Sequence, residues 1–291
     1  MKIAIHGKIF SKDVHKHIQE LFEVLYKSKI EIQISESFEK ILRKARIKHI
    51  PEKIYKDATE LDKNDFFLSL GGDGTLLESV THIGEKETPI VGFNTGRLGF
   101  LATNAPESIK NTIKSLLSGY YGIEERTLLH LECNKNIFDG ANFALNDFTI
   151  TKRDTASMIT VHTYIDGEYL NSYWADGLII ATPTGSTGYS LSCGGPLILP
   201  NSNNFVITPV SPHNLTVRPM IIADESVISF EIEGRSKNFL VSLDSRSRVI
   251  DASFQLAINK EKFKAKLIKF SEQNFLNTLR NKLNWGWDAR N

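Results

Sequence analysis

The sequence predicts a protein of two domains: an N-terminal α/β domain with an open, mainly parallel sheet, and an all-β, sandwich-like C-terminal domain. Three observations predict this organisation. The chain has 291 residues, more than the roughly 100–200 that one domain usually holds. Residues 1–120 alternate between strand and helix patterns, which favours a parallel sheet covered by helices. Residues 121–270 show one strand pattern after another, which is typical of an antiparallel β domain.

The first domain begins with a short strand pattern and then alternates. In the helix expected after Ser11, which can cap it, apolar residues share one face at positions 14, 18, 21, 22 and 25. Ile30, Ile32 and Ile34 alternate as in a half-buried strand. The expected strands are residues 2–6, 30–34, 66–70 and 89–93, and the apolar stripes of the later helices fall at residues 38–45, 76–80 and 109–117.

Strand patterns account for most of the second domain. They lie at residues 128–133, 143–151, 159–165, 178–182, 205–209, 227–232, 239–243 and 254–258. Asp166-Gly167 between two of them indicates a hairpin. Residues 271–291 carry apolar residues at helical spacing, and we expect this segment to pack back on the first domain.

Composition excludes several classes of protein. Lys and Arg number 35 and Asp and Glu 34, so the net charge of +1 gives no electrostatic signal for nucleic acid or a membrane. The two cysteines have no CxxC spacing, which argues against a zinc site. Neither a signal-peptide pattern nor an apolar run of about 20 residues occurs, so we expect a cytoplasmic protein. The P-loop pattern GxxxxGK[ST] and a GxGxxG after the first strand are also missing.

The first motif whose residues could take part in binding or catalysis is Gly71-Gly72-Asp73-Gly74-Thr75, between a predicted strand and a predicted helix. Its glycines permit positive φ angles and close approach of a ligand. Its amides and the N-terminus of the following helix favour phosphate. A carboxylate there repels phosphate unless it has a task, such as accepting a proton from a hydroxyl or holding a divalent metal. The alternative is a tight turn with a capping Asp.

The second motif is a loop rich in glycine and hydroxyl residues. Asp176-Gly177 precede the strand at residues 178–182, and the loop runs through residues 183–192 to Gly194-Gly195-Pro196. Its amides and hydroxyls offer donors to a polar ligand. An ordinary loop is the simpler interpretation of this motif taken alone, although its length and its glycine pair are unusual.

The third motif is Asn146-Asp147, inside the predicted strand at residues 143–151. Asn and Asp are poor strand residues, so their presence needs a reason. They could bind ribose hydroxyls or an adenine edge. The alternative is a β-bulge or the end of a strand.

The fourth motif is the run from Asn94 to Leu101, which follows the strand at residues 89–93. Open α/β sheets bind ligands at this end of their strands. Arg97 could contact a phosphate or form a surface salt bridge.

Together these stretches resemble the NAD kinase family, bacterial type. The resemblance covers about the middle half of the chain and rests on residues 71–75, 94–102, 146–147, 176–196 and 208–213, with Arg218-Pro219. Diacylglycerol kinases, sphingosine kinases and phosphofructokinases share the Gly-Gly-Asp-Gly-Thr turn. The stretch at residues 176–196 is far more specific to NAD kinases.

The resemblance implies an activity. The substrate would lie between the domains, and ATP, or polyphosphate in some members, would phosphorylate the 2′-hydroxyl of the adenosine ribose of NAD to give NADP. A divalent cation, Mg²⁺ being the expected one, would arrive with the donor phosphates, without a dedicated protein metal site. Family members are often homo-oligomers, dimers or tetramers.

The resemblance also implies roles for residues. Asp73 would be the proton acceptor, and Asn146 with Asp147 would bind adenosine. The full set of substrate and nucleotide contacts would be Gly72, Asp73, Gly74, Thr75, Asn94, Asn146, Asp147, Ser157, Asp176, Thr184, Thr187, Gly188, Tyr189, Ser190, Leu191, Ser192 and Arg246.

The sequence departs from the family pattern at three places. Ser157 stands where His is common, and Trp174 replaces a polar or basic residue. Asp244-Ser245-Arg246 stands where Gln often follows a short turn, so Arg246 could instead meet phosphate. Two other functions stay open: a lipid kinase, which the polar groups at residues 146–147 and 176–192 disfavour, and an NAD-binding module without catalysis, which the intact Asp73 disfavours.

Overall fold

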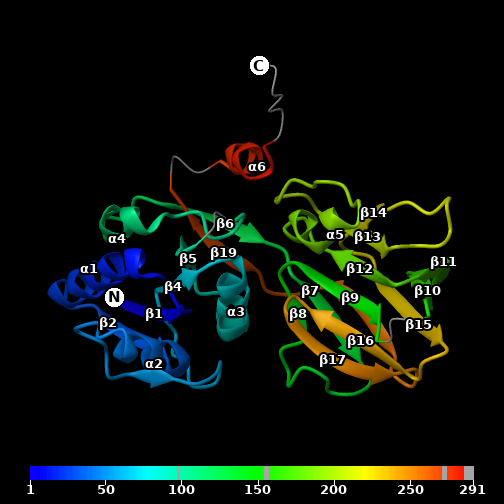
Figure 1. The fold of residues 1–291 in the computed structure, drawn as a ribbon, viewed down its shortest axis with the longest axis horizontal. Helices are drawn as coiled ribbons and strands as arrows, with labels where there is room; N and C mark the ends of the chain where they lie inside the picture. Colours follow the sequence, from blue (N-terminus) through cyan, green and yellow to red (C-terminus); the bar gives the residue numbers. More distant parts are fainter. Residues whose placement is uncertain (97–98, 154–156, 271–273, 285–291) are drawn as a thin grey trace. The chain divides into compact units, whose positions relative to one another are not determined.

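The computed structural model describes residues 1–96, 99–153, 157–270 and 274–284 (Figure 1). The chain separates into two compact units, residues 1–125 with 265–291, and residues 126–264. From the sequence we expected the boundaries at residues 120 and 270. The first unit is α/β and the second consists of antiparallel sheets, so the predicted fold class is confirmed.

The first unit is built on a seven-stranded sheet in the order β3-β2-β1-β4-β5-β19-β6. The ladders from β3 to β19 are parallel. Its strands are β1 (Lys2–Gly7), β2 (Glu31–Ser35), β3 (Ile54–Tyr55), β4 (Phe66–Gly71), β5 (Ile90–Asn94), β6 (Gly122–Arg126) and β19 (Ala265–Lys269). Its helices are α1 (Lys12–Lys27), α2 (Glu36–Lys44), α3 (Asp73–Ile83), α4 (Ile109–Leu117) and α6 (Phe275–Leu283), with short 3₁₀ turns η1 (Gly84–Lys86) and η2 (Pro106–Ser108).

Helix α1 buries the apolar face that the spacing of its residues predicts. The residues that it buries are Val14, Ile18, Leu21, Phe22 and Leu25, the five predicted from their spacing. They join the strand residues of β1, β2 and β4 in one core. Ser11 occupies the N-cap position, but its side chain makes no capping hydrogen bond, contrary to expectation.

Strand β19 is the main departure from the expected organisation. We placed residues 265–269 in the β domain, which we expected to extend to residue 270. They instead pair in parallel with β5 and lie between β5 and β6 in the first sheet. Alternation specifies a strand but not its partner, so the sequence pattern could not reveal this return.

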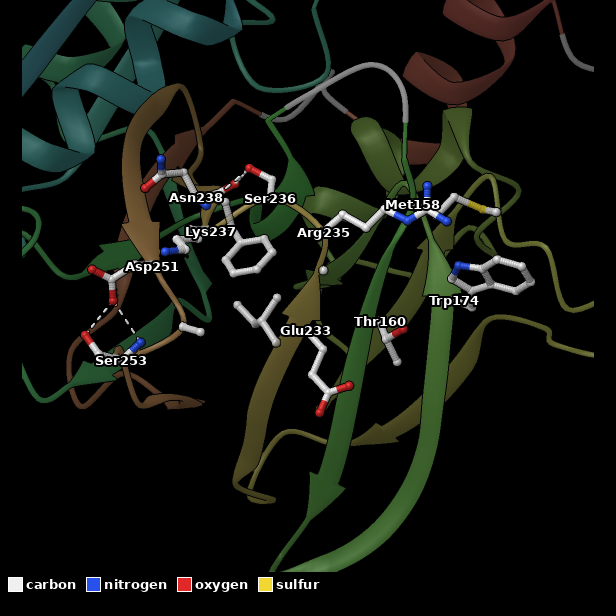
Figure 2. Close-up of a pocket in the computed structure, with 14 residues that line it drawn as sticks. Met158, Thr160, Trp174, Glu233, Arg235, Ser236, Lys237, Asn238, Asp251 and Ser253 are labelled. Atoms are coloured by element: carbon white, nitrogen blue, oxygen red, sulfur yellow. Dashed lines mark hydrogen bonds between the residues drawn. The ribbon is translucent and has the colours of Figure 1, made fainter.

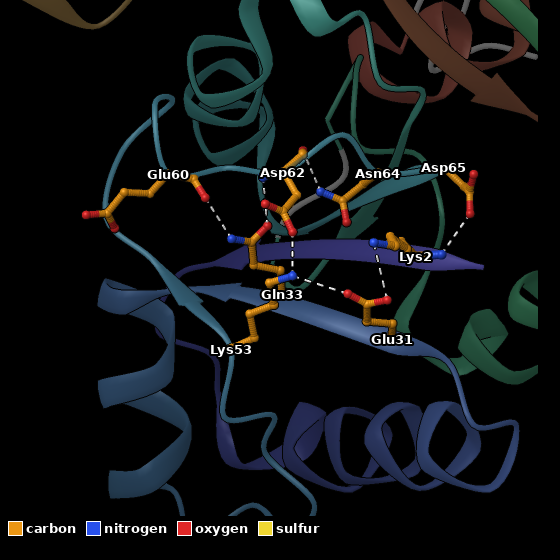
Figure 3. A network of polar contacts seen from close by, with 8 residues as sticks. All are labelled: Lys2, Glu31, Gln33, Lys53, Glu60, Asp62, Asn64 and Asp65. Carbon is orange, nitrogen blue, oxygen red and sulfur yellow. Dashed lines mark hydrogen bonds and ion pairs between the residues drawn. The ribbon is translucent and has the colours of Figure 1, made fainter.

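A polar network fixes the loop after β3 to the outer part of the first sheet (Figure 3). Gln33 Nε2 donates to the Glu60 carbonyl (2.9 Å), and its Oε1 accepts from the Asp62 amide (3.0 Å). Lys53 Nζ lies 2.5 Å from Asp62 and 3.2 Å from Glu31. Exposed ion pairs contribute little. The buried Gln33, which bonds the loop through both ends of its side-chain amide, therefore holds the loop to β2.

The second unit is a pair of six-stranded antiparallel sheets, in the orders β11-β10-β15-β18-β7-β8 and β14-β13-β12-β9-β16-β17. Large apolar side chains from both sheets form one core. The strands are β7 (Leu129–Cys133), β8 (Phe143–Ala144), β9 (Asp147–Lys152), β10 (Ile159–Ile165), β11 (Glu168–Ala175), β12 (Gly177–Ala181), β13 (Asn204–Val210), β14 (Met220–Ala223), β15 (Ile228–Gly234), β16 (Asn238–Leu243), β17 (Arg246–Asp251) and β18 (Leu256–Lys260).

The predicted hairpin at Asp166-Gly167 is confirmed. Both residues have positive φ, 52° and 82°, as a two-residue turn of type I′ requires. The loop after β12 winds into a 3₁₀ turn, η3 (Gly185–Thr187), and a single helical turn, α5 (Tyr189–Ser192).

Candidate functional site

The glycine-rich turn joins β4 directly to α3, with Gly72 as the helix N-cap. The expected positive φ angles are wrong, since Gly71, Gly72 and Gly74 all have other conformations. Gly71 is required for packing, because a Cβ there would lie 2.0 Å from Thr75 Oγ1. At Gly72 and Gly74 a Cβ would meet no described atom within 4 Å. Internal packing therefore does not explain these two glycines, whereas a closely approaching ligand does.

Asp73, the first residue of α3, binds a neighbouring loop through its carboxylate. Oδ2 accepts from the Phe100 amide (2.8 Å), and Oδ1 accepts from the amides of Leu101 and Ala102 (3.0 Å each). The loop comes so close that a Cβ at Gly99 would lie 1.9 Å from Oδ1. A carboxylate has about four acceptor positions. One therefore remains for a further donor, and the side chain is 28% exposed.

The fourth motif lies at the same end of the sheet. The Thr95 amide donates to the Gly71 carbonyl (3.1 Å), which connects the ends of β5 and β4. Asn94 Oδ1 accepts from the Gly96 amide (2.8 Å), so this side chain shapes the turn. Arg97, for which we considered a phosphate contact, lies outside the described residues.

In the second unit, Asn146 and Asp147 occur where β9 begins, which agrees with the strand-end alternative. Their backbone is held by Asp244, in the two-residue turn between β16 and β17. Its Oδ1 accepts from the amides of Asn146 (2.7 Å) and Asp147 (3.2 Å), and its Oδ2 accepts from the Leu145 amide (3.0 Å). Asp244 adopts φ 52°, a left-handed conformation that Asp tolerates better than most residues.

The glycines of the loop after β12 pack against this pair. A Cβ at Gly185 would lie 2.0 Å from the Asn146 carbonyl oxygen. A Cβ at Gly188 would lie 3.7 Å from both Asn146 Nδ2 and Asp147 Oδ2. An amide donor and a carboxylate acceptor therefore face the same glycine, and this pairing can recognise a group that itself offers one acceptor and one donor.

Burial gives Asp147 unusual acid–base behaviour. Its side chain is 7% exposed. Burial, and secondly the charge of Asp244, raise the pKa of Asp147 to about 7. Burial also raises the pKa of Asp244, but three amide donors oppose that shift. Asp147 is therefore expected to gain or lose a proton near neutral pH.

Several hydroxyls of the second motif hold the loop rather than face solvent. Ser186 Oγ donates to the Pro183 carbonyl (2.7 Å), and Ser190 Oγ pairs with Thr208 Oγ1 (2.8 Å). Thr184 Oγ1 accepts from the buried Arg126 (3.1 Å). Internal hydrogen bonds of these hydroxyls therefore position the backbone of the loop, and the loop's role as a set of amide and hydroxyl donors for a ligand stays a prediction.

The remaining expected site residues differ in exposure. Tyr189 and Ser192 are exposed, and Thr187, Gly188 and Leu191 are partly buried. Asp176 lies 2.7 Å from Lys152 Nζ. The pKa of Tyr189 is raised, first by burial and then by the charges of Cys193, Asp176 and Asp147. Ser157 is partly buried and directly follows residues 154–156, which are not described.

Arg246 is bound inside the second unit. Its guanidinium donates to the carbonyls of Ala141 (2.6 Å) and Phe143. It also lies 5.7 Å from the ring centroids of Phe138 and Phe143. Burial lowers the pKa of Arg246. These contacts explain the residue without a phosphate.

A groove of about 1040 Å³ also opens on the second unit, lined by β10, β15 and the turn after β15 (Figure 2). Trp174, whose ring lies 4.3 Å from that of His213, forms one side, and Arg235 and Asp251 are among the other lining residues. None of the expected site residues lines this groove. The candidate site residues therefore lie in the two loop systems above, one in each unit.

Two features are absent from the part of the chain that the structure describes. No group of three His, Cys, Asp or Glu side chains there is arranged to hold a metal ion. Among the same residues, we find no helix with the length and apolar character that a membrane crossing requires.

Sequence reasoning missed the partners that position the acids. The Phe100 amide, which donates to Asp73, lies 27 residues from it along the chain. Asp244, which accepts from the Asn146 amide, lies 98 residues from Asn146. The only local signal at Asp244 is an Asp in a short turn, which is common. Lys282, whose Nζ lies 4.0 Å from Asp73 Oδ2, gave no signal at all.

Comparison with known proteins supplies independent information. The family model described as the ATP-NAD kinase N-terminal domain matches residues 3–121, and the ATP-NAD kinase C-terminal domain matches residues 145–270. An NAD kinase from Cytophaga hutchinsonii is 54% identical over 293 residues, covering 100% of both chains. One from Flavobacterium psychrophilum is 46% identical over 294 residues, again covering 100% of both.

Two solved structures are similar. An Archaeoglobus fulgidus NAD kinase in complex with ATP has a TM-score of 0.74 at 27% identity, covering 98% of this chain and 99% of its own. Yeast NADH kinase complexed with NADH has a TM-score of 0.87 at 23% identity, covering 100% of this chain and 89% of its own, and shows the fold alone.

Proposed function

The chain belongs to the NAD kinase family, and from this premise we propose that it transfers the terminal phosphoryl group of ATP to the 2′-hydroxyl of the adenosine ribose of NAD. The product is NADP. The observation that carries the proposal is the partly exposed Asp73 carboxylate at the N-terminus of α3, between two glycines whose Cβ positions are open. Full-length relatives named NAD kinase support the substrates.

In this proposal Asp73 accepts the proton of the attacking hydroxyl. Three amides hold its carboxylate in one orientation, and its fourth acceptor position is available to the hydroxyl. General-base help of this kind typically contributes 10²–10⁴-fold, about 3–5 kcal/mol of barrier. The Thr75 amide donates to the Gly72 carbonyl (3.0 Å), and the earlier amides of α3, at the positive end of the helix, attract donor phosphates.

The nucleotide is recognised by Asn146 and Asp147. Their neighbouring Nδ2 and Oδ2 atoms supply one donor and one acceptor, which suits an adenine edge or ribose hydroxyls. The backbone near Gly188 permits close approach, and Tyr189 and Ser192 add exposed polar groups. Thr184, Ser190 and Arg246 contribute by holding the surrounding backbone.

The divalent cation of this chemistry would be bound by the donor phosphates. The described residues offer no cluster of ligands for it, so Asp73 and the helix N-terminus fit a phosphate-bound ion better than a protein cage. When bound, the cation would neutralise phosphate charge. We also propose that the enzyme acts in the cytoplasm, in NADP biosynthesis, as a homo-oligomer.

The decisive experiment is an assay of NADP formation with NAD, Mg²⁺ and ATP, repeated with polyphosphate and with diacylglycerol as acceptor. We expect NADP from ATP and no labelled lipid. Asp73→Asn should still bind NAD but turn over at least ~100-fold more slowly. Asp57→Asn, at an exposed loop position of the same unit, is the matched control and should remain active. Near-normal turnover of Asp73→Asn refutes the base assignment.

A further inference from the structure

Helix α6 docks on the loop that Asp73 holds. Phe275, Leu279 and Lys282 are spaced i, i+4 and i+7, so they share one face of the helix. Leu279 is buried. The ring centroid of Phe275 lies 6.4 Å from that of Phe100, and Lys282 Nζ lies 4.8 Å from the Phe100 centroid. Two contacts at opposite ends of α6 therefore converge on one aromatic ring.

This docking places a positive charge beside the acid of the glycine turn. Lys282 Nζ is 4.0 Å from Asp73 Oδ2, beyond hydrogen-bonding distance. Asp73 does not need the ammonium as a donor, because three amides already bind its carboxylate. The Lys282 side chain is 33% exposed, so its head can reach a solvent-borne anion.

We propose that Lys282 binds the phosphoryl group during transfer. This rests on the proposed function. The ribose oxygen forms a bond to the terminal phosphorus while the bond from that phosphorus to the bridging oxygen breaks; ADP leaves, and Asp73 receives the ribose proton. The Lys282 ammonium contacts a non-bridging phosphoryl oxygen. An ammonium at that place offsets charge on the transferring group, a term that dominates catalysis of phosphoryl transfer.

Lys282→Met tests the charge alone, because Met keeps an aliphatic stem against Phe100. We expect kcat to fall about 100-fold or more, with the KM for NAD within about twofold of the unaltered protein. Lys282→Arg keeps the positive charge and should recover much of the loss. Arg280→Met, on the same helix but exposed and bonded to Asn277, is the matched control and should retain activity.

A binding measurement separates this inference from the proposed function. Calorimetry with inorganic tripolyphosphate should show affinity at least about tenfold weaker for Lys282→Met and unchanged for Arg280→Met. Unaltered kcat and tripolyphosphate affinity in Lys282→Met overturn the inference, even if the unaltered protein makes NADP. Equal losses in Lys282→Met and Lys282→Arg, with a lowered melting temperature, also overturn it, because they assign Lys282 a structural role. Absence of NADP from the unaltered protein overturns the proposed function, and the tripolyphosphate result still decides the role of Lys282.

Discussion

Replacing Asp147 by Asn should stabilise the free protein, in a pH-dependent way. Burial and the charge of Asp244 raise the pKa of Asp147 to about 7 in the folded chain, whereas an unfolded Asp titrates near ~3.9. The folded state binds this proton more tightly than the unfolded state does. The free energy of unfolding therefore falls as the pH rises between these two pKa values, and it falls no further once the pH exceeds the folded pKa. A difference of about 3 units corresponds to about 4 kcal/mol.

The assay is urea unfolding of the unaltered protein and of Asp147→Asn at pH 5.5 and pH 8.5. We expect the variant to gain up to about 4 kcal/mol in the free energy of unfolding at the higher pH and roughly half of that at the lower pH. Asp251→Asn is the control, because the pKa of Asp251 is shifted in the opposite direction: hydrogen bonds from Ser253 lower it. It should give no gain at the higher pH.

An equal effect of Asp147→Asn at both pH values would refute the reasoning, as would a loss of stability at pH 8.5. At pH 8.5, where Asp147 is ionised, the same substitution should weaken NAD binding by about tenfold or more, since a charged acceptor is worth about 1.5–3 kcal/mol. A carboxylate kept at a cost to stability is the signature expected of a binding residue.

Three further substitutions test the site geometry. Gly99→Ala should lower kcat about 100-fold, because its Cβ would lie 1.9 Å from Asp73 Oδ1 and must displace the acid; turnover near normal would contradict that role. Gly72→Ala should leave the melting temperature nearly unchanged, because its Cβ meets no described atom within 4 Å, yet reduce NADP formation at least about tenfold by intruding on the ligand; full activity would show that no ligand comes so close. Asp244→Ala should cost about 3 kcal/mol in urea unfolding, about 1 kcal/mol for each of three amides, and an unchanged midpoint would show that water replaces the carboxylate.

The sequence by itself was sufficient for the fold class, and it singled out the two loop systems where we predict that ligands bind. Both depend on local patterns: the 3.6-residue spacing buries the five predicted residues of α1, and Asp166-Gly167 provides two positive φ angles for a hairpin. The glycines around Asp73 were visible for the same reason, although the positive φ angles expected of them are wrong. Their φ angles are not positive, and two of them have open space around the Cβ position.

Only the tertiary structure decided which groups meet the two acids. Asp73 is bound by amides 27 to 29 residues away, and Asp244 binds amides 97 to 99 residues away. Lys282 reaches Asp73 because α6 returns after β19 has joined the first sheet. Periodicity describes which face of an element is buried, but a strand or helix of given pattern fits many partners. The choice among them depends on the packing of the whole unit, which no local stretch of sequence contains.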